Sequence, residues 1–341
     1  MRLLMFLLTL VFVAGCAPAG GASTAIGGNS STAPAAPKIL TIGIRAEPTV
    51  LNTFYSGGSG GANGVSSVWD ILNNYLMAQD ESYAWIPQLA TDAISTEKGS
   101  WRLNSDGTMD TVWRIRPNVR WQDGQPFTSG DLLFSYQVYR DPEIPNEIGL
   151  PIKLMESASI VDPLTFAIHW TQLYVQADRA PGLIPLPRHI LEPLSNTDKA
   201  NFSSSLYFQT EFVGLGPYRL TEWERGAHLN LSRHDGYFLG RPPLDTVTIR
   251  ILENTESLVA HHLGGSVDVA AAVDIDSAVG VRSRWEAEGN IFISQPSTKF
   301  RVLEFQARPE FARPTNGVTN PMVRQALYHA IDRPPLAEAA S

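Results

Sequence analysis

The sequence contains a single cysteine, no block of basic residues and only one long apolar run. Cys16 lies at the end of that run, so the chain beyond it can form no disulfide, no thiolate metal cluster and no cysteine nucleophile. The formal net charge of the 341 residues is −8, whereas nucleic-acid binding depends on clustered Lys and Arg. We therefore expect no nucleic-acid partner, and a stability that comes from burial of apolar side chains.

Metal and nucleotide motifs are also missing from the sequence. His261 and His262 are adjacent, so on a helix their side chains diverge by roughly 100°, whereas two ligands of one metal need a spacing of three or four residues. The remaining histidines have no carboxylate or cysteine neighbours at ligand spacing. No G-x-x-x-x-G-K-[ST] motif is present. We expect no metal and no cofactor, and ATP hydrolysis would belong to a partner.

The N-terminus has the features of an export signal. Met1 and Arg2 give a positive start, residues 3–13 are apolar, and Ala14-Gly15-Cys16 places small residues before a cysteine. This arrangement resembles the bacterial lipobox, in which the cysteine is diacylated and becomes the first mature residue. We interpret residues 1–16 as a lipoprotein signal peptide with Cys16 as the lipidation site. A plain signal peptide or a short transmembrane helix is the alternative, although the apolar run is short for a helix that spans a membrane.

Residues 17–37 consist almost entirely of Gly, Ser, Thr, Ala, Pro and Asn. Such a segment has too few large apolar side chains to offset the entropy of ordering, so it is expected to be a flexible tether. A folded body that starts near Lys38 would then hang from a membrane surface. The predicted location is the cell envelope, on the outer face of the cytoplasmic membrane or in the periplasm.

The body mixes helical and strand patterns. Alternation predicts strands at residues 39–44 and 111–116, the latter in a hairpin with a turn at Asp106-Gly107. Other strands are expected at 160–170 around a turn at 162–163, near 223, and at 229–231, 247–252 and 267–270. Helices are expected at 65–76, from Thr128 or Ser129 onward, at 256–263 and from Pro321, and residues 181–193 read as a proline-rich crossover. This mixture predicts an α/β fold.

The C-terminal segment reads as unfinished. Pro334-Pro335 ends the helix that begins at Pro321 and opens another, which stops after less than two turns with no capping glycine. An amphipathic helix of this kind needs a partner against which to bury its face. We therefore expect the chain to be truncated, with partner sequence beyond Ser341.

Four separated blocks of the body resemble one known family. They are W-R-I-R-P-N-V-R-W-Q-D-G-Q-P-F-T with D-L-L-F-S (113–135), G-L-G-P-Y-R-L with the run to Pro243 (214–243), the glycine and V-D-V of 265–269, and V-R-Q-A-L with A-I-D-R (323–333). In this order they resemble the extracellular solute-binding protein family 5, the oligopeptide, dipeptide and nickel binders of ABC importers. Ser129-Gly130 departs from the family pattern, which more often has Ala and a charged residue there.

The resemblance implies a type II, periplasmic-binding-protein-like fold, with two lobes that close on a ligand and a β-rich domain inserted in the first lobe. Residues 38–75 and 208–294 would form the first lobe, and residues 76–207 the inserted domain. Residues 295–341 would be the start of a truncated second lobe. Family members run well past the A-I-D-R block, so this chain would carry one of the two ligand-binding lobes and bind ligand weakly or not at all.

The candidate ligand-binding residues lie in or beside a glycine-rich loop, residues 56–64, in the helix that follows it, and at the start of the second lobe. Glycines let a ligand approach the backbone closely, and a following helix directs its dipole at a carboxylate or carbonyl. Arg301 could pair with a ligand carboxylate in a bidentate way, although a surface arginine is an equal alternative. The predicted ligand-binding residues are Tyr55, Gly58, Ser59, Asn63, Trp69, Phe300 and Arg301. Trp113, Trp121, Phe127, Phe134 and Tyr136 are expected to be core residues instead.

A serine hydrolase is the alternative from another class. Gly57-Gly58-Ser59-Gly60-Gly61 matches G-x-S-x-G, but the nucleophile elbow needs a strand that runs directly into a sharp turn and a helix. A loop this rich in glycine and serine is too loose to hold a strained serine. We therefore predict no catalytic residue, and a hydrolase that uses Ser59 is the rival hypothesis.

The predicted function is capture of a peptide or similar small solute for an ABC importer. Ligand would bridge two lobes and shift the population toward a closed form that docks on the permease. The expected partners are the solute, the permease with its ATPase, and the membrane through the lipid anchor, and the protein is expected to be a monomer. A binder of oligosaccharide or of a metal chelate with the same fold is the nearer alternative.

Overall fold

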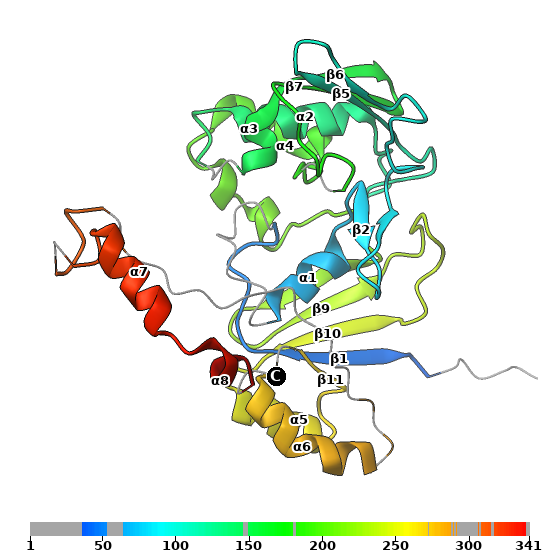
Figure 1. Cartoon of the computed structure of the whole chain (residues 1–341). Coiled ribbons are helices and arrows are strands. Elements are labelled where there is room, and N and C mark those ends of the chain that lie inside the picture. The colour runs from blue at the N-terminus through cyan, green and yellow to red at the C-terminus, as the bar shows by residue number, and fades with distance from the viewer. Residues whose placement is uncertain are drawn as a thin grey trace, which may run out of the picture. The chain divides into compact units, whose positions relative to one another are not determined.

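β1 (Ile39–Ile44) is the strand that the alternating, β-branched sequence predicts. It lies inside a five-stranded sheet of order β11-β1-β10-β9-β8, parallel to β10 (Thr246–Ile251) and to β11 (Val269–Ala270). β8 (Tyr218–Glu224) and β9 (His228–Arg233) complete it as antiparallel strands (Figure 1). Two segments that are far apart in the sequence therefore build one sheet.

The computed structural model describes part of the chain. The described residues are 36–52, 64–145, 149–179, 182–271, 273–287, 289, 291, 306, 308–314 and 317–338. Contacts divide the chain into residues 1–36 and residues 37–341. All described helices and strands belong to the second of these units.

A second sheet forms within the segment assigned to the inserted domain. Its order is β4-β5-β7-β6, and every neighbouring pair is antiparallel. The strands are β4 (Trp101–Leu103), β5 (Met109–Arg114), β6 (Met155–Asp162) and β7 (Thr165–Trp170). The predicted hairpin at Asp106-Gly107 and the predicted strand pair around residues 162–163 are both confirmed. A short hairpin, β2 (Met77–Gln79) with β3 (Trp85–Pro87), precedes this sheet.

α2 (Ser129–Arg140) packs against this four-stranded sheet and begins with a reciprocal cap. The Thr128 hydroxyl accepts a hydrogen bond from the Gly130 amide at 3.2 Å, and the Asp131 carboxylate accepts one from the Thr128 amide at 2.8 Å. This capping box satisfies two amides that the first helical turn leaves without partners. The departure at Ser129-Gly130 is compatible with a well-capped helix, because Thr128 and Asp131 supply the cap.

The aromatic residues that were expected in the core are found there. Trp113, Trp121, Phe127 and Phe134 are buried, and Trp121 packs edge-on against Phe127 with ring centroids 5.8 Å apart. Tyr136 is half-buried, and its hydroxyl donates to the Glu156 carbonyl at 2.9 Å. These side chains are therefore used for packing in the core.

α4 (Arg188–Thr197) corrects one sequence expectation. Residues 181–193 read as a crossover, yet the helix begins at Arg188 and contains Pro193 in its interior. An interior proline costs about 3 kcal/mol in a helix. Leu191 and Ser195 of this helix are buried, and the helix packs against α2, so tertiary contacts support it. Tertiary packing thus outweighs the local signal.

The remaining helices follow their caps. α1 (Val65–Leu72) ends at Leu72, four residues before the predicted end, because the chain at Asn73 becomes extended toward β2. Helix α7 (Pro321–Ala330) begins at Pro321 as predicted, and the side chain of its N-cap residue, Asn320, accepts a hydrogen bond from the Met322 amide at 2.9 Å. The other helices are α3 (Leu150–Leu154), α5 (Thr255–Leu263), α6 (Ile275–Ala287) and α8 (Arg333–Glu338). Single 3₁₀ turns lie at Phe202–Ser204 and Leu206–Phe208.

The Gln122 side chain joins the segment that carries the four-stranded sheet to the segment that enters β8. Its side-chain oxygen accepts a hydrogen bond from the backbone amide of Gly214 at 3.0 Å. Its side-chain nitrogen donates hydrogen bonds to the backbone carbonyls of Gly216 at 3.1 Å and Tyr218 at 2.7 Å. The backbone amide of Gln122 also donates to the Gly214 carbonyl at 3.1 Å. Two of the sequence blocks that carry the family resemblance therefore meet here.

Both glycines of this junction lie against the end of α1. The Gly216 amide donates to the Leu72 carbonyl at 2.9 Å. A Cβ atom at Gly214 or Gly216 would overlap with the carbonyl groups of Ile71 and Leu72. Glycine is required at both positions because the backbone passes too close to the helix for a side chain. We call Gln122, Gly214 and Gly216 with the end of α1 the glycine junction.

Replacement of Gln122 by alanine should destabilise the protein by about 1 to 3 kcal/mol, because it leaves half-buried backbone groups of the glycine junction without partners. Denaturant unfolding measures the change. Gln125→Ala is the matched control, because Gln125 is exposed and lies three residues further along the chain. We expect the control to change stability by less than about 0.5 kcal/mol. Equal losses from the two substitutions would contradict this account of the junction.

Candidate ligand-binding site

The three parallel strands of the five-stranded sheet end at one edge. β1, β10 and β11 run in the same direction, so their carboxyl ends lie side by side. The Leu252 amide donates to the Ile44 carbonyl at 2.8 Å, and the Ala271 amide donates to the Gly43 carbonyl at 2.9 Å. In open α/β sheets, ligands bind in the crevice outside the carboxyl ends of the strands. We call this region the carboxyl edge.

Helix α1 begins at the carboxyl edge. Gly64 is its N-cap residue, has φ of 83°, and provides no side-chain cap. A Cβ atom at Gly64 would lie 3.0 Å from Cγ2 of Ile44 and 3.1 Å from Cβ of Ala271. The chain that leaves the glycine-rich loop therefore packs directly on the ends of β1 and β11. The positive end of the α1 dipole lies at this edge as a result.

A second helix and a guanidinium add positive potential at the same edge. Helix α5 follows β10 and starts after Asn254, whose side chain accepts from the Ser257 amide at 2.7 Å. Arg45, the first residue after β1, donates to the Thr255 hydroxyl at 3.1 Å. Sequence reasoning did not single out Arg45 or Thr255. The sequence signal that could have identified them is their position, since each residue closely follows a predicted strand.

The loop after β1 is tied to the β8–β9 turn by Glu47. Its carboxylate accepts hydrogen bonds from the indole N–H of Trp223 at 2.7 Å and from the Gly226 amide at 3.2 Å. The Arg225 guanidinium lies over the Trp223 ring at 3.6 Å and is 3.5 Å from the same carboxylate. These contacts hold the segment that leads from β1 toward the glycine-rich loop.

Of the predicted ligand-binding residues, the structure describes Trp69. It lies on α1, is 6% exposed, and donates its indole N–H to the Val50 carbonyl at 3.2 Å. Its contact with a ligand stays a prediction. The other predicted ligand-binding residues lie outside the described residues, as does the predicted lipidation site, Cys16. These ligand-binding residues are Tyr55, Gly58, Ser59, Asn63, Phe300 and Arg301.

Two histidines form short contacts with carboxylates. His189 Nε2 lies 2.6 Å from Asp123, and His169 Nδ1 lies 2.6 Å from Asp110. A catalytic triad needs the second ring nitrogen to face a serine hydroxyl. The second nitrogen of His169 instead lies 3.5 Å from the Glu156 carboxylate. Both nitrogens of His169 therefore face acidic groups.

Residues 84–341 match the bacterial extracellular solute-binding proteins, family 5. The chain belongs to this family. The match covers most of the chain, including all four strands of the second sheet and Gln122, Gly214 and Gly216 of the glycine junction.

Relatives of the family 5 chain include two curated binding proteins. Oligopeptide-binding protein AppA of Bacillus subtilis (strain 168) is 24% identical over 299 residues, which are 86% of this chain and 50% of AppA. Glutathione-binding protein GsiB of Escherichia coli (strain K12) is 24% identical over 245 residues, which are 71% of this chain and 44% of GsiB. The chain thus spans about half the length of the curated relatives it matches.

Solved structures share the fold. NikZ from Campylobacter jejuni, determined in complex with Ni(L-His), gives a TM-score of 0.69 at 23% identity and covers 87% of this chain and 54% of NikZ. AppA from Bacillus subtilis, determined with a nonapeptide, gives a TM-score of 0.57 at 24% identity and covers 68% of this chain and 44% of AppA. The expected α/β fold of a family 5 binding protein is confirmed.

A hollow of about 190 Å³ opens on the four-stranded sheet of this family 5 chain, away from the carboxyl edge. Its charged groups include Lys98 and Asp92, which form an exposed ion pair at 3.0 Å. Exposed pairs of this kind contribute little to stability. The lining residues are Thr91, Asp92, Ala93, Ile94, Lys98, Gly99, Ser100, Val112 and Arg114.

In the part of the chain that the structure describes, no group of three or more His, Cys, Asp or Glu side chains is arranged to hold a metal ion. None of the described helices combines the length and the apolar character that a membrane span requires.

Substitution of Gly64 by alanine should destabilise the carboxyl edge through two effects. The left-handed backbone costs about 1 to 2 kcal/mol for a residue with a Cβ atom, and the added methyl also crowds Ile44 and Ala271. Gly226→Ala is the matched control, because Gly226 has φ of 75° but nothing within 4 Å of its Cβ position. We expect a larger loss for Gly64→Ala in denaturant unfolding. Identical losses would show that no crowding exists at this edge.

Proposed function

We propose that the chain is the solute-binding part of an ABC importer and captures peptides or similar small solutes. The family match over residues 84–341 carries this function. Ligand would bridge two lobes and shift the population from an open to a closed form, which docks on the permease. The permease and its ATPase are the partners that this role requires.

The carboxyl edge supports a ligand with a negatively charged or strongly polar group. The N-terminal ends of α1 and α5 both lie at this edge, and Arg45, the first residue after β1, donates to the Thr255 hydroxyl. Backbone amides at helix N-termini bind carboxylates without a dedicated cationic side chain. Oligopeptides and glutathione, which the names of AppA and GsiB specify, both carry carboxylates. A peptide is therefore the ligand class that we favour.

Binding by domain closure needs no reactive side chain, so the proposed role is not enzymatic. The predicted contacts are backbone amides of the glycine-rich loop around Gly58, with Tyr55, Ser59, Asn63 and Trp69 from the first lobe. Phe300 and Arg301 would contact the ligand from the border with the second lobe. A metal chelate stays the second candidate, because NikZ was solved with Ni(L-His).

Arg301→Ala tests the ligand class. If Arg301 pairs with the terminal carboxylate of a peptide, the substitution should remove about 1.5 to 3 kcal/mol of binding free energy, which is roughly tenfold or more in Kd. Calorimetry on the full gene product should show this loss for an oligopeptide with a free C-terminus. The same peptide with an amidated C-terminus should bind the wild type and the variant with equal affinity.

Arg308→Ala is the control for general charge effects, since Arg308 is exposed and stacks on Phe311 at 4.9 Å. Equal affinity for the free and amidated peptides would refute carboxylate recognition. Covalent labelling of Ser59 by a serine-reactive phosphonate, detected by mass spectrometry and absent in Ser59→Ala, would favour the hydrolase instead.

We further propose that Cys16 is diacylated and anchors the protein to the membrane, with residues 17–37 as the tether. Acyl chains partition into a bilayer with about 0.8 kcal/mol per buried methylene, so two chains hold a protein firmly. Cys16→Ser should move the protein from the membrane fraction to the soluble fraction, and the acyl mass should disappear from the N-terminal peptide. Retention of Cys16→Ser on membranes would contradict the anchor.

A further inference from the structure

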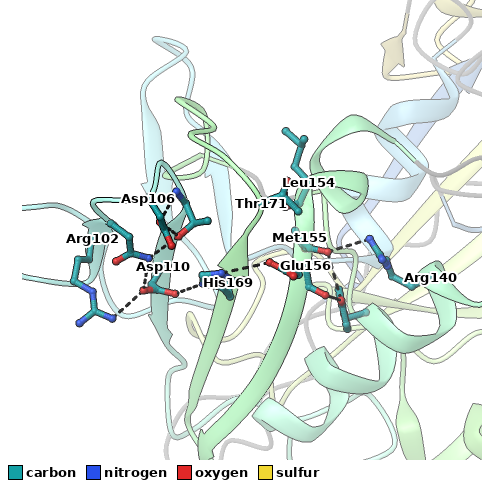
Figure 2. A network of polar contacts seen from close by, with 12 residues as sticks. Arg102, Asp106, Asp110, Arg140, Leu154, Met155, Glu156, His169 and Thr171 are labelled. Atoms are coloured by element: carbon teal, nitrogen blue, oxygen red, sulfur yellow. Dashed lines mark hydrogen bonds and ion pairs between the residues drawn. The ribbon is translucent and has the colours of Figure 1, made fainter.

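His169 lies in a row of charged groups that crosses all four strands of the four-stranded sheet. It is on β7, directly opposite Asp110 of β5 and Ser157 of β6 in the strand register. Its Nδ1 is 2.6 Å from Asp110, and its Nε2 is 3.5 Å from the Glu156 carboxylate. Figure 2 shows the imidazole between these two carboxylates, with Arg102 on the far side of Asp110 at 2.8 Å.

Glu156 belongs to an irregular part of the edge strand β6. The pairing register with β7 shifts between Met155 and Ser157, so Glu156 is the extra residue of a β-bulge. From the opposite face α2 holds the bulge, because Arg140 donates to the Met155 carbonyl at 3.0 Å and the Tyr136 hydroxyl donates to the Glu156 carbonyl at 2.9 Å. The side chain of Glu156 reaches the outer face, where it meets His169 (Figure 2).

An imidazole can donate from both nitrogens only when it is protonated. Neutral histidine has one N–H and one lone pair, whereas carboxylates only accept hydrogen bonds. A neutral His169 could therefore satisfy Asp110 or Glu156, but not both, and its lone pair would face the other carboxylate. Asp110 and Glu156 therefore each face an N–H donor only when His169 is protonated.

We propose that His169 is a proton-operated clamp, which in its charged form fixes the bulge of edge strand β6 to β5 across β7 and which opens this edge of the sheet when the proton leaves. Asp110 is the fixed end of the clamp, because Arg102 and Asn104 also bind its carboxylate. Glu156 is the movable end, since its side chain is 61% exposed and lies on an edge strand.

The charges around the ring favour the protonated form. Three carboxylates face it, those of Asp110, Glu156 and Asp106, and the one cation in the row, Arg102, is bound to Asp110. The hydrogen bond to Asp110 raises the pKa of His169 above its ordinary value of 6.5, against a smaller opposing effect of burial. Burial raises the pKa of Asp110, but hydrogen bonds from Arg102, His169 and Asn104 outweigh this and lower the pKa to about 2.

These shifts define the pH window of the clamp. A histidine whose pKa is raised on folding contributes stability that is fully present below its unfolded pKa and is lost as the pH rises through its folded pKa. The contribution of His169 is therefore complete below 6.5 and is lost as the pH rises through its raised folded-state pKa. Asp110 contributes above 3.8 and loses its contribution as the pH falls through about 2. The clamp is closed at pH values between the pKa of Asp110, about 2, and the raised pKa of His169.

The test measures hydrogen exchange of the β6 amides in the purified full chain at about pH 6 and about pH 9, each divided by the intrinsic rate. Protection of β6 should fall at the higher pH, because a neutral His169 no longer attracts the Glu156 carboxylate of β6. In His169→Gln, protection should be low at both pH values and independent of pH. Titration of the His169 ring protons by NMR should give a midpoint above 6.5.

Two further variants separate the clamp from general effects of substitution. Glu156→Gln keeps the shape of the side chain and should lower the His169 midpoint. His228→Gln is the matched control, because His228 lies 3.5 Å from Glu222 and 3.4 Å from Glu224 on the other sheet, and it should leave the pH dependence of β6 unchanged. An equal fall of β6 protection in wild type and His169→Gln, or a His169 midpoint at or below 6.5, would overturn the proposal.

Discussion

The close approach of Gly214 and Gly216 to the end of α1 is the constraint on which the rest of the described structure depends. The Gly216 amide binds the Leu72 carbonyl, and neither glycine has room for a Cβ atom. Gln122 then binds this same stretch with both ends of its side chain amide. One contact region therefore connects the segment that carries the four-stranded sheet, the entry to β8, and the helix that starts at the carboxyl edge.

This junction explains why the carboxyl edge has a defined geometry. α1 is held at its C-terminal end by the glycine junction and at its N-terminal end by the packing of Gly64 on Ile44 and Ala271. Glu47 holds the loop after β1 to the β8–β9 turn. A helix fixed at both ends directs its dipole in a constant direction, which is the pre-organisation that binding by backbone amides needs.

Local patterns predicted most of the regular elements correctly. The strand at β1, the hairpin at Asp106-Gly107, the capped start of α2 and the start of α7 at Pro321 follow from alternation, turn residues and caps. Prediction was wrong for α4, where burial of one helix face outweighs an interior proline, and for the end of α1. In both places a contact with a distant segment decides the outcome, and such contacts leave no local signal.

The sequence by itself determined the family, the α/β class and the residue types of the candidate site, because these are written in short motifs and in periodicity. Tertiary structure decided which segments share a sheet, that Arg45 and Thr255 meet at the carboxyl edge, and that His169 lies between Asp110 and Glu156. The physical reason is that these pairs are joined by strand order and register. Order and register depend on burial summed over the whole chain, not on the neighbours of any one residue.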